Sequence, residues 1–136
     1  MLPSRRLALL IGVADLLTAA VVTVGVFMGL PARWAPVDLA AGALVAMKVG
    51  SGVSLLARAS WAPRLARVAA ALALAFGVAL VTTLALTASW LSGVYGPVGR
   101  SGALLLTLVA ALALPYLVVL PAAELLWLRS APPKAK

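Results

Sequence analysis

The residues of this chain that could take part in chemistry are few, and most of the usual ones are absent. The sequence contains no histidine, no cysteine and only three acidic residues, Asp15, Asp38 and Glu124. Without imidazole or thiol groups, the chain lacks the common ligands of zinc, copper and haem, and it has no cysteine for nucleophilic or redox chemistry. We therefore expect no catalytic residue, no cofactor and no metal site, and we expect the protein not to be an enzyme.

The elements that must position the remaining polar side chains are long apolar segments. Of the 136 residues, 65% are hydrophobic and 10% are charged, against about 25% charged in a typical soluble domain. A hydrocarbon core about 30 Å thick requires about 20 apolar residues of helix. Four runs meet this requirement, over residues 7–30, 37–57, 66–92 and 101–128. The sequence therefore predicts an all-α integral membrane protein with four spans.

The connections between these runs are too short for a second folded domain. Sequential membrane helices joined by such loops are antiparallel neighbours, so residues 1–136 are expected to form a single transmembrane domain, an up-down-up-down four-helix bundle. Residues 130–136 are expected to form a short disordered basic tail. The first apolar run is longer than the core of a signal peptide, which indicates a retained span.

The basic residues are divided unequally between the two ends of the predicted bundle. Arg33 and Arg100 fall at one end. Those at the other end are Arg5, Arg6, Arg58, Arg64, Arg67, Arg129, Lys134 and Lys136. Because Lys and Arg are enriched in cytoplasmic loops, both termini are expected in the cytoplasm. The net charge of +8 is then expected to face an anionic inner leaflet rather than nucleic acid.

Tryptophans occur at the predicted ends of the helices. An indole ring is favoured at the boundary between headgroups and hydrocarbon. The four tryptophans, expected as interface anchors, are Trp34, Trp61, Trp90 and Trp127. The excess of arginine over lysine and the abundance of alanine are typical of a GC-rich bacterial genome, so the expected location is a bacterial inner membrane.

Two opposite charges are predicted at the same depth inside the membrane. Asp15 lies nine residues after Arg6. Lys48 lies ten residues before Arg58. At about 1.5 Å per residue these positions are about 13 and 15 Å from the cytoplasmic end, where a lone charge costs on the order of 3 kcal/mol or more. We therefore predict an intramembrane ion pair between Asp15 and Lys48.

Polar neighbours accompany this pair. Thr18 lies on the same helix face as Asp15, and Ser51 lies one turn from Lys48 on the second helix. Ser51 and Lys48 also have a spacing compatible with a serine and lysine dyad. A lysine whose charge is held by a carboxylate is a poor general base, and serine is a common packing residue in membrane helices. We expect packing rather than catalysis.

Small residues recur at intervals of four on the second and third helices. Such a ridge lets another backbone approach closely within lipid. On the second helix, opposite Lys48, the ridge consists of Gly42, Ala46, Gly50 and Ser54. On the third helix it consists of Ala71, Ala75, Ala79 and Thr83. The sequence leaves open whether these helix-packing ridges close the bundle or face a partner protein.

Two prolines and one acid fall in the fourth run. Pro115 and Pro121 lack amide donors and free the carbonyls four residues before them, so a kink is expected there. Glu124 is about one turn from Arg129. It is expected near the interface as an ion-paired or snorkelling acid.

Two functions are compatible with these features. The first is a small non-enzymatic polytopic membrane protein that acts as a structural or assembly subunit of a larger membrane complex, with a larger membrane protein or further copies of itself as partner. The alternative is a small ion-coupled transporter or channel that uses Asp15 and Lys48 as its intramembrane site, because ionisable residues in membrane helices often mark ion pathways.

Overall fold

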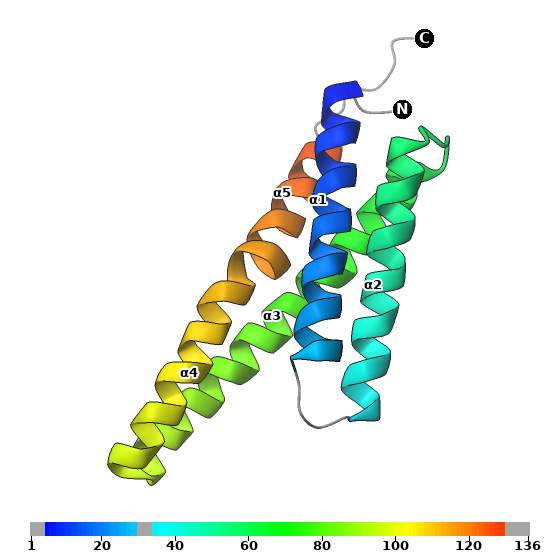
Figure 1. Cartoon of the computed structure of the whole chain (residues 1–136). Coiled ribbons are helices and arrows are strands. Elements are labelled where there is room, and N and C mark those ends of the chain that lie inside the picture. The colour runs from blue at the N-terminus through cyan, green and yellow to red at the C-terminus, as the bar shows by residue number, and fades with distance from the viewer. Residues whose placement is uncertain (1–4, 30–33, 130–136) are drawn as a thin grey trace. The chain divides into compact units, whose positions relative to one another are not determined.

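The computed structural model describes residues 5–29 and 34–129, and every regular element among them is helical. The elements are α1 (Arg5–Thr23), η1 (Val24–Met28), α2 (Ala35–Leu56), α3 (Ala62–Val94), α4 (Gly96–Leu114), η2 (Pro115–Val119) and α5 (Leu120–Arg129). Here η1 and η2 are π-helical segments, and Figure 1 labels the α-helices. The predicted tail, residues 130–136, lies outside the described residues.

Four helices are long and apolar enough to cross a membrane. They cover Arg5–Met28, Ala35–Leu56, Ala62–Val94 and Gly96–Arg129. The prediction of an all-α chain with four membrane-length helices is therefore confirmed, and these helices indicate a multi-pass membrane protein. The last two are longer than predicted, at 33 and 34 residues.

The turn between α3 and α4 is shorter than the gap between the predicted spans, which end at residue 92 and begin again at residue 101. Glycines and a proline between residues 93 and 99 are typical of a longer loop, yet α3 ends at Val94 and α4 begins at Gly96. Gly96 has a φ of +57°, a left-handed conformation that costs glycine little. Pro97 follows in the first turn of α4, where a missing N–H leaves no helical hydrogen bond unmade. One left-handed glycine therefore reverses the chain.

The chain divides into two compact units. The first contains residues 1–72 and 123–136, and the second contains residues 73–122. The apolar core of the first unit combines side chains of α1, α2, α3 and α5, namely Ile11, Leu55, Ala62, Ala66 and Leu128. The Arg67 guanidinium also donates to the Leu128 carbonyl at 2.9 Å, and so provides a partner for a carbonyl at the end of α5.

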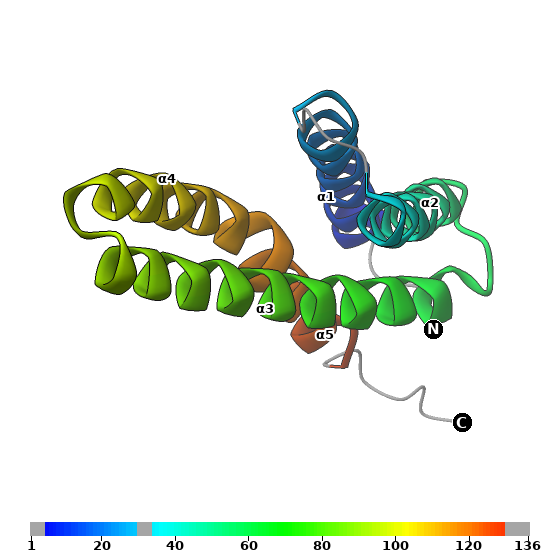
Figure 2. The same cartoon turned by 90° about the horizontal axis from the view of Figure 1, so that it is seen from below.

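Helices α1 and α2 lie side by side and antiparallel within the first unit (Figures 1 and 2). Their backbones come close together at two glycines. A Cβ added to Gly12 would lie 3.1 Å from the Gly52 carbonyl oxygen, and one added to Gly52 would lie 2.8 Å from the Gly12 carbonyl oxygen. The absence of side chains at both positions allows the two backbones to approach this closely.

Helix α2 ends in a Schellman motif with an unusual residue at its left-handed position. The Ala59 N–H donates to the Ser54 carbonyl at 3.0 Å, and the Arg58 N–H donates to the Leu55 carbonyl at 3.1 Å. Arg58 has a φ of +57°, a conformation that such motifs usually assign to glycine and that costs other residues roughly 1 kcal/mol or more. An arginine is therefore held in a backbone conformation that it does not favour.

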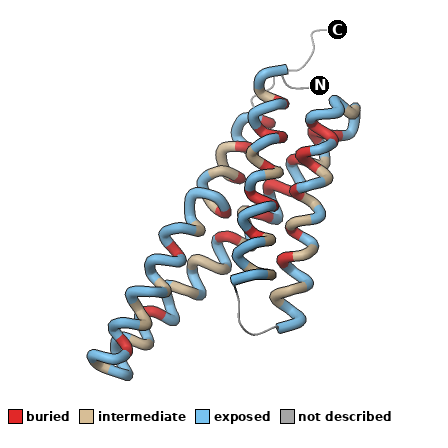
Figure 3. Tube along the Cα trace, in the orientation of Figure 1, coloured by how far each residue is buried: buried red, intermediate tan, exposed pale blue. Residues whose placement is uncertain are grey.

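The second unit is a pair of antiparallel helices with little buried surface. Its segments of α3 and α4 run side by side in both views (Figures 1 and 2). A Cβ at Gly77 of α3 would collide with the backbone of Leu117 in η2. Figure 3 shows α4 exposed along most of its length. Its exposed large side chains include Leu104, Leu105, Leu108 and Leu112, which suit a helix face in contact with lipid tails.

The two prolines of the fourth membrane-length helix are accommodated by η2. Here the Leu120 N–H donates to the carbonyl of Pro115, five residues earlier. The irregularity expected from Pro115 and Pro121 thus takes the form of a five-residue π-helical segment that continues into α5. Such wide turns allow a membrane helix to pass through proline without leaving the helical path.

The glycine contact between α1 and α2 predicts the effect of one added methyl group. Gly52→Ala is expected to lower the free energy of unfolding by about 1 to 3 kcal/mol, because the new Cβ must displace the α1 backbone or Leu16. Gly25→Ala is the matched control, since its Cβ would meet nothing within 4 Å. Unfolding in mixed detergent micelles, followed by circular dichroism, measures both. Equal stability of the two variants would contradict the close contact.

Candidate functional site

A cluster of ionic and polar side chains is buried inside the first unit. It consists of Asp15 from α1, Lys48 and Ser51 from α2, and Glu124 from α5. The exposed fraction is 0% for Asp15, Lys48 and Ser51 and 1% for Glu124. We refer to these four residues as the ionic cluster. It joins the first two long helices of the chain to α5, which is far from them in the sequence.

The lysine ammonium lies at the centre of the ionic cluster. Lys48 Nζ donates to Oδ1 of Asp15 and forms an ion pair with it. The same Nζ donates to Oε2 of Glu124 at 2.7 Å. The second oxygen of the aspartate, Oδ2, accepts a hydrogen bond from Ser51 Oγ at 2.5 Å. One ammonium is therefore shared between two carboxylates, and the hydroxyl fixes the orientation of one of them.

Local structure explains how these side chains meet. Ser51 follows Lys48 by one helical turn, so both lie on the face of α2 that packs on α1. The contact between Gly12 and Gly52 lies within one turn of the ionic cluster along each helix. A short aspartate side chain can bridge two helices only where their backbones are close. The glycine contact therefore permits the ion pair.

Of the four polar residues predicted from the sequence, three belong to the ionic cluster and one lies beside it. Asp15, Lys48 and Ser51 are brought together, as their depth and spacing predict. Thr18 is buried as well, but its hydroxyl donates to the Ala14 carbonyl at 2.9 Å within its own helix. Thr18 is therefore a neighbour of the ionic cluster and not one of its members.

Glu124 is the functional candidate that sequence reasoning misplaced. Its position near Arg129 predicts an acid at the membrane interface, whereas the structure buries it against Lys48. The error arises because a comparison of backbone depths leaves out the length of a lysine side chain, which extends several ångströms along the bundle. A signal was present in the sequence, since Glu124 is the one charged residue between positions 101 and 128.

The predicted packing ridge of α2 is not the surface that meets α1. A Cβ at Gly50 would lie 3.5 Å from Leu65 of α3, and one at Gly42 would lie 4.0 Å from Phe27 of η1. Ala46 is exposed, while Ser54 is buried and donates to the Ser51 carbonyl at 2.9 Å. The ridge thus has several different neighbours, and the close contact with α1 is made by Gly52 on another side of the helix.

The tryptophans lie where the pattern predicts. Each is exposed, and each is at or within a few residues of a helix end: Trp34, Trp61, Trp90 and Trp127. Trp90 also makes an edge-to-face contact with Tyr95, with ring centroids 6.0 Å apart. Exposed aromatic rings at helix ends are typical of the boundary between lipid headgroups and hydrocarbon.

The formal charges of the ionic cluster do not balance. With every group ionised, one ammonium and two carboxylates carry a net charge of −1. Within the described residues, Glu124 Oε1 is buried and has no hydrogen-bond partner. One proton on a carboxylate oxygen would make the cluster neutral and would provide a donor where a bare oxygen now stands. The arrangement is therefore chemically suited to holding one additional proton.

Similarity to known proteins adds no second source of information about the ionic cluster. No family model, no curated protein and no solved structure matches the chain. Across residues 5–29 and 34–129, no group of three His, Cys, Asp or Glu side chains is placed to hold a metal ion. An interpretation of the cluster therefore depends on its geometry and its charge.

The second carboxylate changes what substitutions in the ionic cluster should do. An isolated ion pair predicts that replacing Asp15 and Lys48 together by leucine restores folding. With Glu124 on the same ammonium, Lys48→Leu alone should cost about 3 to 5 kcal/mol, and the double variant should remain poorly folded because Glu124 is stranded. Adding Glu124→Leu should recover most of the yield. Size-exclusion chromatography in mild detergent measures the folded fraction.

Thr18→Val is the matched control for these variants, because it removes a buried polar group of α1 that lies outside the ionic cluster. We expect its folded yield to be close to that of the unsubstituted chain. A double variant that folds as well as the triple variant would show that Glu124 contributes no unpaired charge.

Proposed function

We propose that this protein is a small non-enzymatic structural or assembly subunit of a larger membrane complex. The observation that carries this proposal is an uncovered ridge of small residues on α3. All four members are exposed: Ala71, Ala75, Ala79 and Thr83. The Thr83 hydroxyl donates to the Ala79 carbonyl at 2.8 Å, which satisfies it within the helix and leaves the ridge free of unpaired hydroxyl donors.

An exposed ridge of small residues favours a helix as its neighbour. Apolar burial does not drive association between helices in lipid, so close packing of backbones and the contacts that it allows become decisive. Elsewhere in the chain, glycines at close contacts are already covered, as at Gly12 with Gly52 and at Gly77 with Leu117. The ridge on α3 offers a similar surface without a partner from the described residues.

The ionic cluster fits the same proposal as an internal lock. It ties α1, α2 and α5 together through hydrogen bonds that all run between residues of this chain. A buried charged group that has one arrangement of partners can fix the register of packed helices. In a subunit, these interactions would keep the helices of the first unit in a fixed arrangement, while the ridge of small residues on α3 stays available for a partner.

The proposed orientation has both termini in the cytoplasm of a bacterial cell, in its inner membrane. The described arginines of the first unit support it, because they gather at the start of α1, the end of α2, the start of α3 and the end of α5: Arg5, Arg6, Arg58, Arg64, Arg67 and Arg129. Arg100 lies near the start of α4. Arg33, Lys134 and Lys136 lie outside the described residues.

A second candidate function is ion-coupled transport, and one observation favours it. The ionic cluster contains a carboxylate in excess over its ammonium, and Glu124 Oε1 has no hydrogen-bond partner among the described groups. Buried carboxylates that can accept a proton occur in proton pathways through membranes. In this alternative, a proton carried by the pair of Asp15 and Glu124 would be the coupling ion.

The subunit proposal predicts selective crosslinking at the α3 ridge. The chain contains no cysteine, so Ala75→Cys provides a single attachment point for a photoreactive maleimide in native membranes. We expect Ala75→Cys to give a discrete product at higher mass, because the ridge faces a neighbouring helix. Ala111→Cys, which is exposed on α4, is the matched control and should give little product. Equal products from both positions would indicate random collision and would oppose the proposal.

The transport alternative is tested by proton flux into liposomes that contain the purified protein. A structural subunit gives no flux above that of empty liposomes. If transport is the function, flux appears, Glu124→Gln abolishes it, and Asp38→Asn leaves it intact, because Asp38 lies in the first turn of α2 and outside the ionic cluster. Flux that survives both Glu124→Gln and Asp15→Asn would exclude the cluster as its pathway.

A further inference from the structure

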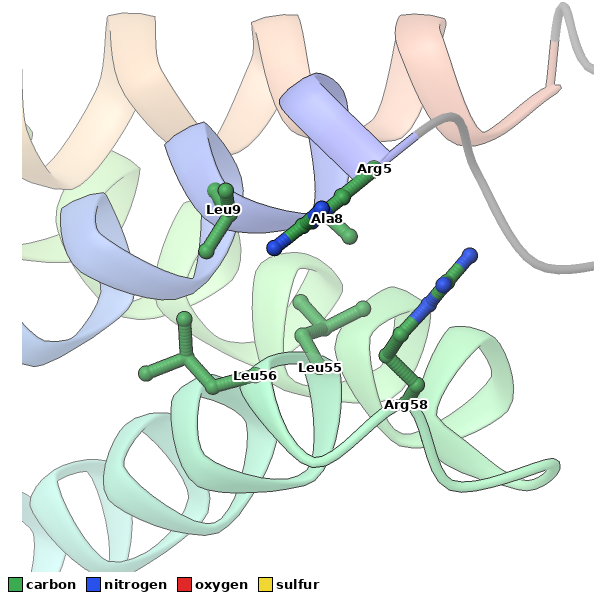
Figure 4. Close-up of a pocket in the computed structure, with 6 residues that line it drawn as sticks. All are labelled: Arg5, Ala8, Leu9, Leu55, Leu56 and Arg58. Carbon is green, nitrogen blue, oxygen red and sulfur yellow. The ribbon is translucent and has the colours of Figure 1, made fainter.

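A pocket lined by two arginines opens where α1 begins and α2 ends. Its volume is about 240 Å³, and it is lined by Arg5, Ala8, Leu9, Leu55, Leu56 and Arg58. Figure 4 shows the Arg5 and Arg58 side chains in the space between these two helices, with leucines beside them. The pocket thus combines two cationic groups with an apolar floor.

The apolar floor continues onto the part of the chain that is suited to lipid contact. Leu9 is 45% exposed and Leu56 is 38% exposed, and both belong to helices long and apolar enough to cross a membrane. The two arginines lie at the ends of those helices. A molecule in this pocket therefore meets two cationic groups and, beside them, the apolar side chains of the leucines.

None of the three acidic side chains is placed to pair with these arginines. The chain contains three acidic residues in total. Asp15 and Glu124 are both held by Lys48. Asp38 lies in the first turn of α2, whereas Arg58 lies just beyond the last turn of the same helix, about 30 Å away at 1.5 Å per residue. An anion for this pocket must come from outside the chain's own side chains.

The backbone at Arg58 is a second, independent observation. Its φ of +57° belongs to the left-handed region, where glycine is the usual residue at the end of a Schellman motif. The hydrogen bonds of that motif are made by backbone groups, so glycine would make them equally well. An arginine at a strained position, directed to a pocket that contains another arginine, points to a role for its side chain.

We propose that this pocket binds the phosphodiester headgroup of an anionic glycerophospholipid. The guanidinium groups of Arg5 and Arg58 would donate to the phosphate oxygens, a pairing for which arginine is well suited because its donors form a planar fork. An acyl chain of the same molecule would lie along Leu9 and Leu56. A free phosphate ion would leave this apolar surface unused, so the shape of the pocket favours the lipid.

The proposal is tested by titrating the purified full-length chain with phosphatidylglycerol in mild detergent and following lipid adducts by native mass spectrometry. Arg5→Gln should weaken the first binding step about tenfold or more, as expected when a charge-assisted contact is lost. Arg6→Gln is the matched control, because it removes the same charge from the neighbouring residue, which does not line the pocket. It should weaken binding by less than about fivefold, the effect of general surface charge.

Arg58→Gly separates the binding role from a structural one. It should raise the melting temperature of the lipid-free protein, because glycine relieves the left-handed backbone, and it should weaken lipid binding about tenfold or more. A variant that is more stable and binds equally well would overturn the proposal. The proposal would also be overturned if Arg5→Gln and Arg6→Gln weakened lipid binding equally, or if the chain bound phosphatidylcholine as tightly as phosphatidylglycerol. Full displacement of the lipid by inorganic phosphate at equal concentration would overturn it as well.

Discussion

The buried ammonium of Lys48 is the group on which the first unit depends. A charge removed from water in an apolar interior requires partners with good geometry, and here it has two carboxylates from helices at opposite ends of the sequence. Because Asp15 is on α1 and Glu124 on α5, neither helix can slide or rotate without exposing a charge to an apolar surrounding. The ionic cluster therefore determines the register of α1, α2 and α5 more strictly than apolar contacts alone would.

The ionic cluster in turn depends on the absence of side chains nearby. Leucine and valine at the crossing of α1 and α2 would give more apolar contact, but they would separate the backbones beyond the reach of an aspartate. Gly12 and Gly52 have the opposite effect. They provide no side-chain contacts at this point, but they let the backbones come close enough for Asp15, Lys48 and Ser51 to meet. Close packing and charge pairing are thus two parts of one arrangement in this unit.

Much of the fold follows from sequence patterns that reflect simple physical requirements. Runs of about 20 apolar residues predict membrane-length helices because the hydrocarbon core has a nearly fixed thickness, and four such helices are present. The partnership of Asp15 with Lys48 follows from equal depth. The early start of α4 does not follow, because the glycines and the proline at residues 93–99 suggest a loop, whereas one left-handed residue, Gly96, is enough for the reversal.

The place of Glu124 could not be obtained from depth alone. Depth along a helix says how far a residue lies from the interface, but its direction around the axis depends on every irregular turn before it. The π-helical segment η2 precedes Glu124 in the same long helix, and an extra residue in one turn rotates all later side chains by about 100°. On an ideal helical wheel Glu124 nevertheless shares a face with Leu117, Pro121 and Leu128, which are all buried in the structure. Depth alone leaves this direction out, so it places the acid at the interface.

The contact between Gly77 and Leu117 links two residues that lie on separate membrane-length helices. Residue 121 is proline, so the Leu117 carbonyl receives no hydrogen bond from the position four residues later. Its oxygen occupies the space where a Cβ of residue 77 would stand, and the Cα hydrogen of the glycine is directed at it as a weak donor. Glycine at 77 therefore has two effects at once: it leaves room for this oxygen, and it brings a hydrogen close to an acceptor that Pro121 leaves without its usual helical donor.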